Sequence, residues 1–497
     1  MEMEVDQERK GDAESGSSCV VVQDLDLDAT LVNTTERRLM TKIDLHLLPV
    51  LCVLYLLAFL DRVNISNAVI FGLKEELGIE SGNRYNAALT IFFLPYILLE
   101  IPSNVLLKKL KPHLWLSGCM FGFGLTTLCQ GLVQNYAALL VTRFLLGVFE
   151  TGMFPGCFYL LGMWYQRTEA QKRFSFFFSS TTLAGAFGGM LASAIGKMHG
   201  TRGYLGWRWI FILEGLLTCL VSFAFFFVIP DFPEDVKWLN EEERSFIRAK
   251  LAKDVGAAGH EMSVGVKDVL DVFKDLKIFV GGFMYFGLIV PAYGYAYFAP
   301  TIIKTYGYSP IQTQLYSIPP WAAAFCFSLA VAYLSDRLRN RFVFTVIPTC
   351  IAIAGFAILL NVHGKENRSV QYGALFLVTC GVFSAMPIII CWYAMNLGGH
   401  KRRSIGIAWQ IGFGNIGGII ATFAFLEKDR PEFRNGHTIS VSFICLSSVS
   451  CIAYFFLLLH RNRSRDKLAA VDTAGVPDQA AIDPHLGDLS PSYRYQL

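Results

Sequence analysis

Apolar segments recur along most of the chain, and they constrain its fold more than any other feature. They run from His46 to His460 and are separated by short polar loops. An α-helix needs about 20 predominantly apolar residues to cross a bilayer. Only 17% of the residues are charged, whereas a soluble domain carries about 25%. The chain is therefore predicted to be a membrane protein with many spans.

Segments of this length number twelve, in two groups of six. The predicted fold class is an all-α polytopic membrane protein, with twelve transmembrane helices in two six-helix lobes. The spans are predicted near residues 46–68, 85–106, 114–133, 137–164, 173–196, 207–229, 277–301, 312–334, 342–361, 372–394, 404–426 and 437–460. The corresponding parts are an N-terminal tail at 1–45, a first lobe at 46–229, a central loop at 230–276, a second lobe at 277–460 and a C-terminal tail at 461–497.

The central loop is predicted to hold two surface helices. Asn240 is a typical helix N-cap, and three glutamates follow it, which favours a helix reaching about Lys253. A second amphipathic stretch, Val264 to Lys277, leads into the seventh span. The loop is too short for an enzyme domain, and no catalytic motif is present, so we expect a protein that is not an enzyme.

Charge and cysteine usage limit the partners. Lys and Arg near the span ends are more numerous on the side that would hold both tails, which predicts cytosolic termini. The expected location is the plasma membrane. The twelve Cys are scattered without ligand-like spacing, so we expect no metal and no cofactor. A net charge of +3 does not indicate nucleic acid. The acidic N-terminus lacks the basic start of a signal peptide, and we expect a monomer.

The two halves repeat one pattern. Lys172-Arg-Phe-Ser leads to Gly188-Gly in the fifth span, and Arg402-Arg-Ser leads to Gly417-Gly in the eleventh. Paired glycines let membrane helices approach closely. A parallel repeat of six spans is typical of secondary transporters with two lobes. Glycine pairs are also common in membrane helices generally, but the shared basic lead-in favours a repeat.

Ionisable residues inside spans gather in the first half. Arg143 and Glu150 are seven residues apart in the fourth span, so they lie on nearly the same face of one helix. Asp61 and Arg62 lie in the first span. Such residues are costly in a bilayer and usually mark a substrate or ion path. Arginine can hold an anion with its planar fork, and a buried carboxyl can change its protonation when a ligand arrives. The alternative is that Asp61–Arg62 and Arg143–Glu150 only neutralise each other.

The second half offers neutral groups instead. They are Tyr293, Tyr295, Tyr297, Trp321, Trp392, Asn396, Gln410 and Asn415. We expect Trp392, Gln410 and Asn415 to contact the substrate from the second lobe. Asn and Gln also bond one membrane helix to another, which remains the alternative.

These residues resemble the major facilitator superfamily from about Arg37 to Arg463, and more narrowly the fungal allantoate permease family of its anion:cation symporter branch. The resemblance rests on Leu60-Asp-Arg-Val-Asn-Ile-Ser-Asn-Ala, Ile101-Pro-Ser-Asn, Arg143-Phe-Leu-Leu-Gly-Val-Phe-Glu-Thr-Gly-Met-Phe-Pro-Gly, Gly206-Trp-Arg-Trp-Ile-Phe-Ile-Leu-Glu-Gly, Gly414-Asn-Ile-Gly-Gly and Arg430-Pro-Glu-Phe-Arg-Asn-Gly-His. Together these motifs are specific, although each alone is weak.

The resemblance implies an alternating-access symporter. Asp61 and Glu150 would couple transport to protons, and Arg62 and Arg143 would meet the substrate carboxylate. Asn415 would contribute from the other lobe. The expected substrate is a small organic anion such as nicotinate, allantoate or a related monocarboxylate, imported with a proton across the lipid bilayer.

The sequence keeps the superfamily's gating-loop motif in the second half but departs from the family pattern in the first half and in span five. The acidic-basic gating loop is intact at Asp336, Arg337 and Arg341, but the first half has Leu107-Lys-Lys-Leu-Lys-Pro-His without the Asp. Span five lacks the proline typical of drug antiporters, which disfavours export. An exporter of a secondary metabolite or drug and a non-transporting nutrient receptor remain the alternatives.

Overall fold

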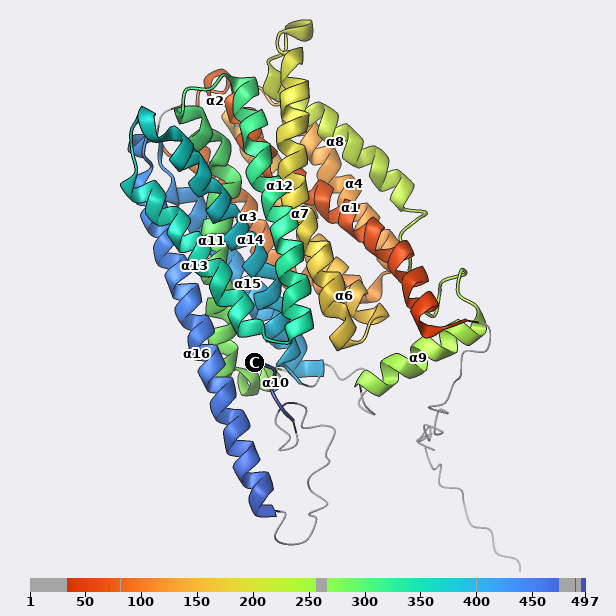
Figure 1. Ribbon diagram of the computed structural model, residues 1–497. Coiled ribbons are helices and arrows are strands. Elements are labelled where there is room, and N and C mark those ends of the chain that lie inside the picture. Colours follow the sequence, from red (N-terminus) through yellow and green to blue (C-terminus); the bar gives the residue numbers. More distant parts are fainter. Residues whose placement is uncertain (1–33, 81, 256–265, 399, 473–487, 489–492) are drawn as a thin grey trace, which may run out of the picture.

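The computed structural model describes residues 34–80, 82–255, 266–398, 400–472, 488 and 493–497. All regular structure in these residues is helical, and the helices form an upright bundle (Figure 1). The long helices of the first half are α1 (Glu36–Ile70), α3 (Arg84–Lys109), α4 (Pro112–Gln130), α5 (Tyr136–Glu150), α6 (Met153–Trp164), α7 (Arg167–Ile195) and α8 (Gly206–Phe225). Those of the second half are α11 (Leu276–Thr305), α12 (Pro310–Leu338), α13 (Arg341–Asn361), α14 (Arg368–Met395), α15 (His400–Ala424) and α16 (Arg434–Asp472).

Ten helical segments among the described residues are long and apolar enough to span a membrane. α3 and α4 lie where the other two spans were predicted, and α5 with α6 forms one interrupted span. In the first half α4 packs on α8 and α1 on α7; in the second half α11 packs on α15 and α16, and α13 on α14. The predicted fold class is confirmed.

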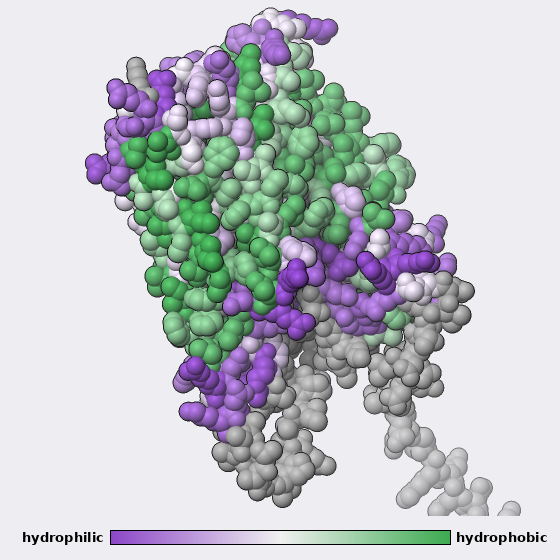
Figure 2. Space-filling view, in the orientation of Figure 1, coloured by the Kyte–Doolittle hydropathy of each residue, from purple (hydrophilic) through white to green (hydrophobic). Residues whose placement is uncertain are grey.

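The outer surface of the bundle is apolar. Figure 2 shows a hydrophobic band on the visible face, with polar residues at both ends. Large apolar side chains on the helices are exposed here, among them Leu98, Val141, Leu220, Phe223, Val449 and Phe456. Such exposure is unfavourable in water but favourable against lipid.

The end of the bundle that holds α9 (Glu241–Val255), α10 (Val266–Phe273) and the described C-terminal residues is called the tail end here (bottom of Figure 1). The opposite end, near α2 (Leu73–Glu76), is called the far end. α9 and α10 correspond to the two predicted loop helices. Lys42 of α1 contacts Glu243 of α9 at 2.8 Å, so α9 is tied to the first lobe.

Two helices are longer than the hydropathy predicts. α1 begins at Glu36, ten residues before the predicted span, and α16 continues to Asp472, beyond the predicted tail boundary at 461. In the added part of α1, Leu39, Met40 and Ile43 are buried whereas Arg37 and Arg38 are exposed. Such an amphipathic stretch is stable as a helix outside the bilayer, so hydropathy alone underestimates its length.

The lobes meet through small residues. α7 packs on α12, where a side chain at Gly189 would lie 2.6 Å from Ser317 Oγ, and α3 packs on α15, where a side chain at Gly418 would overlap the Phe93 ring. These glycines belong to the two repeated motifs. α7 and α15 are the equivalent helices of the two lobes, and each packs against the other lobe at its glycine motif. Glycine allows this close approach.

Candidate functional site

A buried ion pair joins α1 to the end of α5. Arg62 Nε donates to Glu150 Oε1 at 2.7 Å, and Arg62 Nη2 donates to the same oxygen. The side chains are 3% and 0% exposed. The guanidinium of Arg62 also lies over the rings of Phe92 and Tyr96 of α3, 5.2 Å from each centroid. The aromatic rings and the carboxylate together offset part of the cost of burying this cation.

The local sequence explains why Glu150 ends its helix. Pro155 of α6 lacks the N–H that would bond to the Thr151 carbonyl, and its ring crowds that carbonyl. The interrupted helix resumes at Met153, and the Thr151 hydroxyl at the break donates to Tyr96 O of α3 at 2.7 Å. Gly147 lets α5 approach α3, because a Cβ there would collide with the Phe92 carbonyl. Glu150 is thereby held against α1 and α3.

The ion pair reaches the second lobe through one tyrosine. Arg62 Nη1 donates to the hydroxyl of Tyr293 in α11. Tyr293 stacks with Tyr297 at 5.8 Å and meets Phe93 of α3 edge-on at 5.1 Å. The three donor groups of one arginine thus connect two helices of the first lobe with the second lobe. The pair therefore has contacts in both lobes.

Arg143 lies next to the pair without joining it. Its Nη1 donates to the carbonyl oxygen of Arg62 at 3.2 Å, and the residue is 1% exposed. Nε and Nη2 have no hydrogen-bond partner among the described residues. These two nitrogens form one edge of the guanidinium, which is a geometry suited to a carboxylate. The alternative pairing of Arg143 with Glu150 on one helix face does not occur, because Glu150 turns to Arg62.

Asp61 points to a different place. It is 0% exposed and lies beside Thr218 of α8, and neither carboxyl oxygen has a hydrogen-bond partner among the described residues. One turn further along α1, Asn64 Nδ2 donates to Glu214 Oε2 of α8 at 2.6 Å. Asp61 and Arg62 therefore face different helices, and only Arg62 lies in the inter-lobe cluster. Asp61 belongs to a separate polar contact between α1 and α8.

The three predicted contacts of the second lobe lie in three environments. Asn415 of α15 lies beside Glu100 of α3, between the lobes. Gln410 Nε2 donates to Gly281 O of α11 at 3.2 Å, so it joins two helices of one lobe. Trp392 Nε1 donates to Gln496 O at 2.9 Å, at the tail end of the bundle. Of these three residues, only Asn415 contacts a residue of the first lobe through the bonds described here.

The gating residues form a local ion pair. Asp336 at the end of α12 contacts Arg341 of α13 at 2.6 Å, and Arg337 is exposed. In the first half, where the loop lacks the acid, His113 Nδ1 contacts Asp231 at 2.7 Å. At the far end, Lys74 of α2 contacts Glu427 of the second lobe at 2.6 Å. Asn86 Nδ2 of α3 donates to Thr422 O of α15 nearby, at 2.5 Å.

Sequence reasoning did not assign three of these groups. Tyr293, Lys74 and Glu427 link the lobes but were not among the predicted site residues. The tyrosines at 293, 295 and 297 were noticed as polar groups in a span, and this spacing was the available signal for Tyr293. Lys74 lies in the short helix α2 and Glu427 begins a 3-10 turn 353 positions later, and no sequence pattern connects them.

Comparison with known proteins places this geometry in context. The family model described as "Major Facilitator Superfamily" matches residues 51–422. The chain is 32% identical to "MFS-type transporter cnsO" of Penicillium expansum, covering 99% of this chain and 98% of that one. It is 28% identical to "Major facilitator-type transporter hxnP" of Emericella nidulans, covering 93% of each.

A solved structure has the same fold. It is a bacterial homologue of the human lysosomal transporter Spinster, described as inward-facing and unoccupied. The TM-score is 0.62 at 14% sequence identity, covering 85% of this chain and 97% of that chain. At this identity the likeness concerns the fold alone.

Proposed function

The chain belongs to the major facilitator superfamily and is a membrane transporter, and from this premise we propose that it imports a small organic anion together with a proton. The proposed cycle is alternating access, in which the cluster of Arg62, Arg143, Glu150 and Tyr293 is exposed first to one side of the membrane and then to the other. The proposed substrate is a monocarboxylate such as nicotinate or allantoate.

The observation that carries the proposal is the free edge of Arg143. A buried arginine with two unpartnered donor groups is costly, since each unmade hydrogen bond costs about 1–3 kcal/mol. A carboxylate that accepts from Nε and Nη2 would remove this cost and neutralise the charge. A neutral substrate would leave the cation uncompensated. The site therefore favours an organic anion.

Proton coupling is proposed at Glu150. When Glu150 is ionised it occupies Arg62, as in the ion pair described above. A proton on Glu150 would remove its charge and release the Nε and Nη2 donors of Arg62. Arg62 and Arg143, which are linked through the Arg62 carbonyl, could then both face the substrate carboxylate. The proton and the anion would in this way favour each other's binding, which is the requirement for symport.

Asp61 is proposed as the second proton-binding group. It is fully buried next to Thr218, and no cation is among its partners in the described residues. An ionised carboxylate in such a place is strongly disfavoured. Asp61 immediately precedes Arg62 in α1, so a change of its charge would act on the helix that carries the cluster. Its role differs from that of Glu150 because it lies towards α8.

The second lobe would supply the contacts that select the substrate. Tyr293 and Asn415 are the candidates at the interface, since both approach residues of the first lobe. The rings of Phe92, Tyr96 and Tyr293 surround the guanidinium of Arg62 and suit an aromatic or planar acid. Gln410 and Trp392 have partners within the second lobe or at the tail end. We assign them a supporting role in holding that lobe together.

The direction and location are part of the proposal. Basic side chains gather at the tail end, including Arg173, Arg341, Arg402, Arg461 and Arg465, which favours a cytosolic tail end and a far end outside the cell. In the plasma membrane an inward proton gradient would then drive import. Export by the same symport would carry the coupled proton outward, against this gradient.

The test uses protein reconstituted in vesicles and a matched pair of compounds. Nicotinate and nicotinamide have nearly the same shape, but only nicotinate carries a carboxylate. If the proposal holds, nicotinate or another monocarboxylate from a panel is taken up and the corresponding amide neither enters nor competes. Equal transport of acid and amide would exclude the anion-binding role of Arg143. Specific binding of an acid without any transport would support the receptor alternative.

A further inference from the structure

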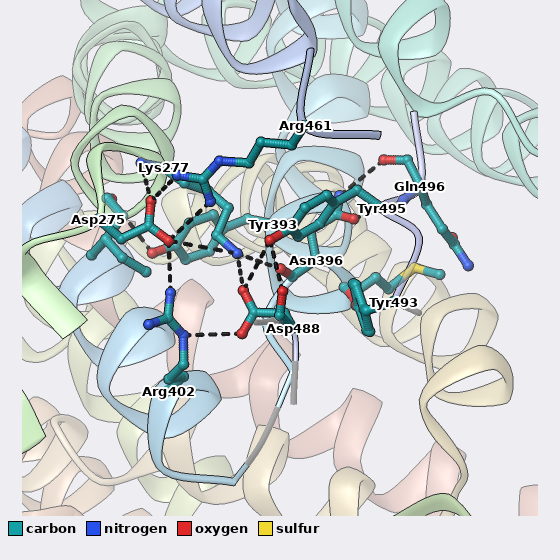
Figure 3. A network of polar contacts seen from close by, with 12 residues as sticks. Asp275, Lys277, Tyr393, Asn396, Arg402, Arg461, Asp488, Tyr493, Tyr495 and Gln496 are labelled. Carbon is teal, nitrogen blue, oxygen red and sulfur yellow. Dashed lines mark hydrogen bonds and ion pairs between the residues drawn. The ribbon is translucent and has the colours of Figure 1, made fainter. Parts of the chain in front are cut away.

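A second polar network lies at the tail end of the second lobe, and it is built around the chain's own C-terminal residues (Figure 3). Asp488 and Tyr493–Leu497 are called the C-terminal segment here. We propose that this end of the lobe is a binding site for the C-terminal segment, and that the docked segment clamps the ends of α11, α13, α14 and α16 together. The proposal rests on the fold and these contacts and does not depend on the transported substrate.

Two asparagine side chains hold the backbone of the segment. Asn462 of α16 donates from Nδ2 to Tyr495 O, and its Oδ1 accepts from Tyr495 N, each at 2.9 Å. Asn396, directly after α14, makes the same pair of hydrogen bonds with Gln496. Its Nδ2 donates to Gln496 O at 2.9 Å, and its Oδ1 accepts from Gln496 N at 2.8 Å. A carboxamide can satisfy one N–H and one C=O at once. Two such contacts on consecutive residues indicate a site made for an extended peptide.

The Asp488 carboxylate is held by two cationic side chains, Lys277 and Arg402. It is 0% exposed, Lys277 Nζ of α11 donates to Oδ2, and Arg402 Nε of α15 lies 3.0 Å from Oδ1. Lys277 is also 0% exposed, and its Nζ donates to Asn396 O at 2.9 Å. A lysine buried in this way needs an acid beside it. Asp275, at 4.0 Å from Lys277, is also held by Arg402 and Arg461, so Asp488 supplies the second negative charge of the network.

Tyr495 is the anchor of the segment. It is 3% exposed, and its ring lies 4.6 Å from Lys277 Nζ and 4.7 Å from the Arg465 guanidinium. Its hydroxyl donates to Asp488 O at 2.9 Å. Tyr495 therefore connects the two described parts of the segment. A buried aromatic ring between two cations is a strong recognition element.

The segment spans the helices of one lobe. Its last residue accepts a hydrogen bond from Arg341 N of α13 at 3.0 Å, and Arg341 is the partner of Asp336. Trp392 Nε1 donates to Gln496 O, and Tyr493 donates to Met395 O at 2.8 Å, both at α14. With Lys277 in α11 and Asn462 in α16, the segment bridges the ends of four helices, and Arg402 of α15 contacts it as well. The clamp would make the second lobe move as one body.

The test is hydrogen–deuterium exchange of the complete protein in micelles, followed by mass spectrometry of the peptide ending at Leu497. We expect its amides to exchange at least about tenfold more slowly than in a free peptide of the same sequence, because Tyr495 N and Gln496 N are hydrogen-bonded in the docked segment. Asp488→Asn should raise the exchange rate. Because this variant also takes an acid from the buried Lys277, the melting temperature is measured in parallel, which separates undocking of the segment from unfolding of the lobe.

A second variant and a matched control sharpen the test. Asn396→Ala removes both contacts to Gln496 and should also speed exchange. Gln496→Ala keeps the backbone bonds to Asn396 and should exchange like the parent, because the Gln496 side chain is exposed. Exchange in the parent at the rate of the free peptide would overturn the proposal. So would equal protection in the parent and in Asp488→Asn.

Discussion

Arg62 donates to Glu150 with two nitrogens and to Tyr293 with the third. A single guanidinium therefore holds the Glu150 carboxylate and also contacts the second lobe. Arg143 lies next to it with one edge unpartnered among the described residues. The two arginines of the cluster therefore differ in their hydrogen bonding. One is occupied by the chain's own carboxylate, and the other is available to an anion.

Arg143 is the residue at which substrate charge should be recognised. Arg143→Lys keeps the positive charge but loses the planar fork, and Arg143→Gln loses both. We expect Arg143→Lys to raise the KM about tenfold and Arg143→Gln to raise it further, since a charge-assisted bidentate contact contributes about 1.5–3 kcal/mol. The measurement is initial uptake against substrate concentration. An unchanged KM in Arg143→Gln would remove Arg143 from the binding site.

Gly147 should control the position of the cluster. A methyl group there would collide with the Phe92 carbonyl and lie 2.8 Å from Pro95 Cγ, so Gly147→Ala should push α5 away from α3. We expect a loss of about 1–3 kcal/mol in stability and a large loss of transport, because Arg143 and Glu150 are on α5. The control is Gly162→Ala in α6, where nothing lies within 4 Å of the added group. Equal effects of the two substitutions would contradict the close-packing role.

Lys74 and Glu427 should hold the two lobes together at the far end. The pair is at 2.6 Å, and the Glu427 side chain is 37% exposed, so its energy is about 0.2–1 kcal/mol. We expect Lys74→Gln and Glu427→Gln each to change the initial uptake rate by about two- to fivefold. In the double variant the effects should not add, since each single change already removes the pair. Additive effects would mean that the two residues act independently.

Asp275 gives a pH dependence outside the spans. Burial tends to raise its pKa, but hydrogen bonds from Arg461 and the charges of Lys277 and Arg461 outweigh this and lower the pKa to about 2. A carboxyl whose pKa is lowered in the folded protein contributes its full stabilisation when the pH is above its ordinary pKa, about 3.9. This stabilisation is lost as the pH falls towards 2.

The corresponding variant is Asp275→Asn. We expect it to lower the melting temperature by a similar amount at pH 5 and pH 8, since Asp275 is ionised throughout this interval. The difference from the parent should narrow below about pH 4. Thermal unfolding in micelles at several pH values measures this. A difference that disappears between pH 8 and pH 5 would show that another group dominates the network.

Hydropathy was sufficient to predict the spans and the two lobes, because burial in lipid demands long apolar helices. The cost of a charge in a span also singled out Arg62, Arg143 and Glu150 as candidates, and these three lie together in the structure. Their pairing was not predictable from spacing. Arg143 and Glu150 share one helix face, but the interruption near Pro155 and the approach of α1 turn Glu150 to Arg62.

Contacts between distant segments were also beyond the sequence. Tyr293 meets Arg62 only because of the relative depth of α1 and α11, which hydropathy does not determine. The C-terminal segment has no apolar periodicity, and it was predicted as part of a tail. Its docking depends on side chains of four helices, including Asn396 and Asn462, that come together only in the folded lobe.

Glu150 is the residue proposed to couple the anion to the proton. The most direct test measures labelled substrate and proton influx together in vesicles, for the parent and Glu150→Gln, with exchange of substrate at equal pH as the control for binding. We predict that the parent concentrates the anion with an inward proton gradient and takes up protons with it. Glu150→Gln should retain exchange but lose gradient-driven accumulation. Accumulation and proton influx equal to those of the parent in Glu150→Gln would contradict the account.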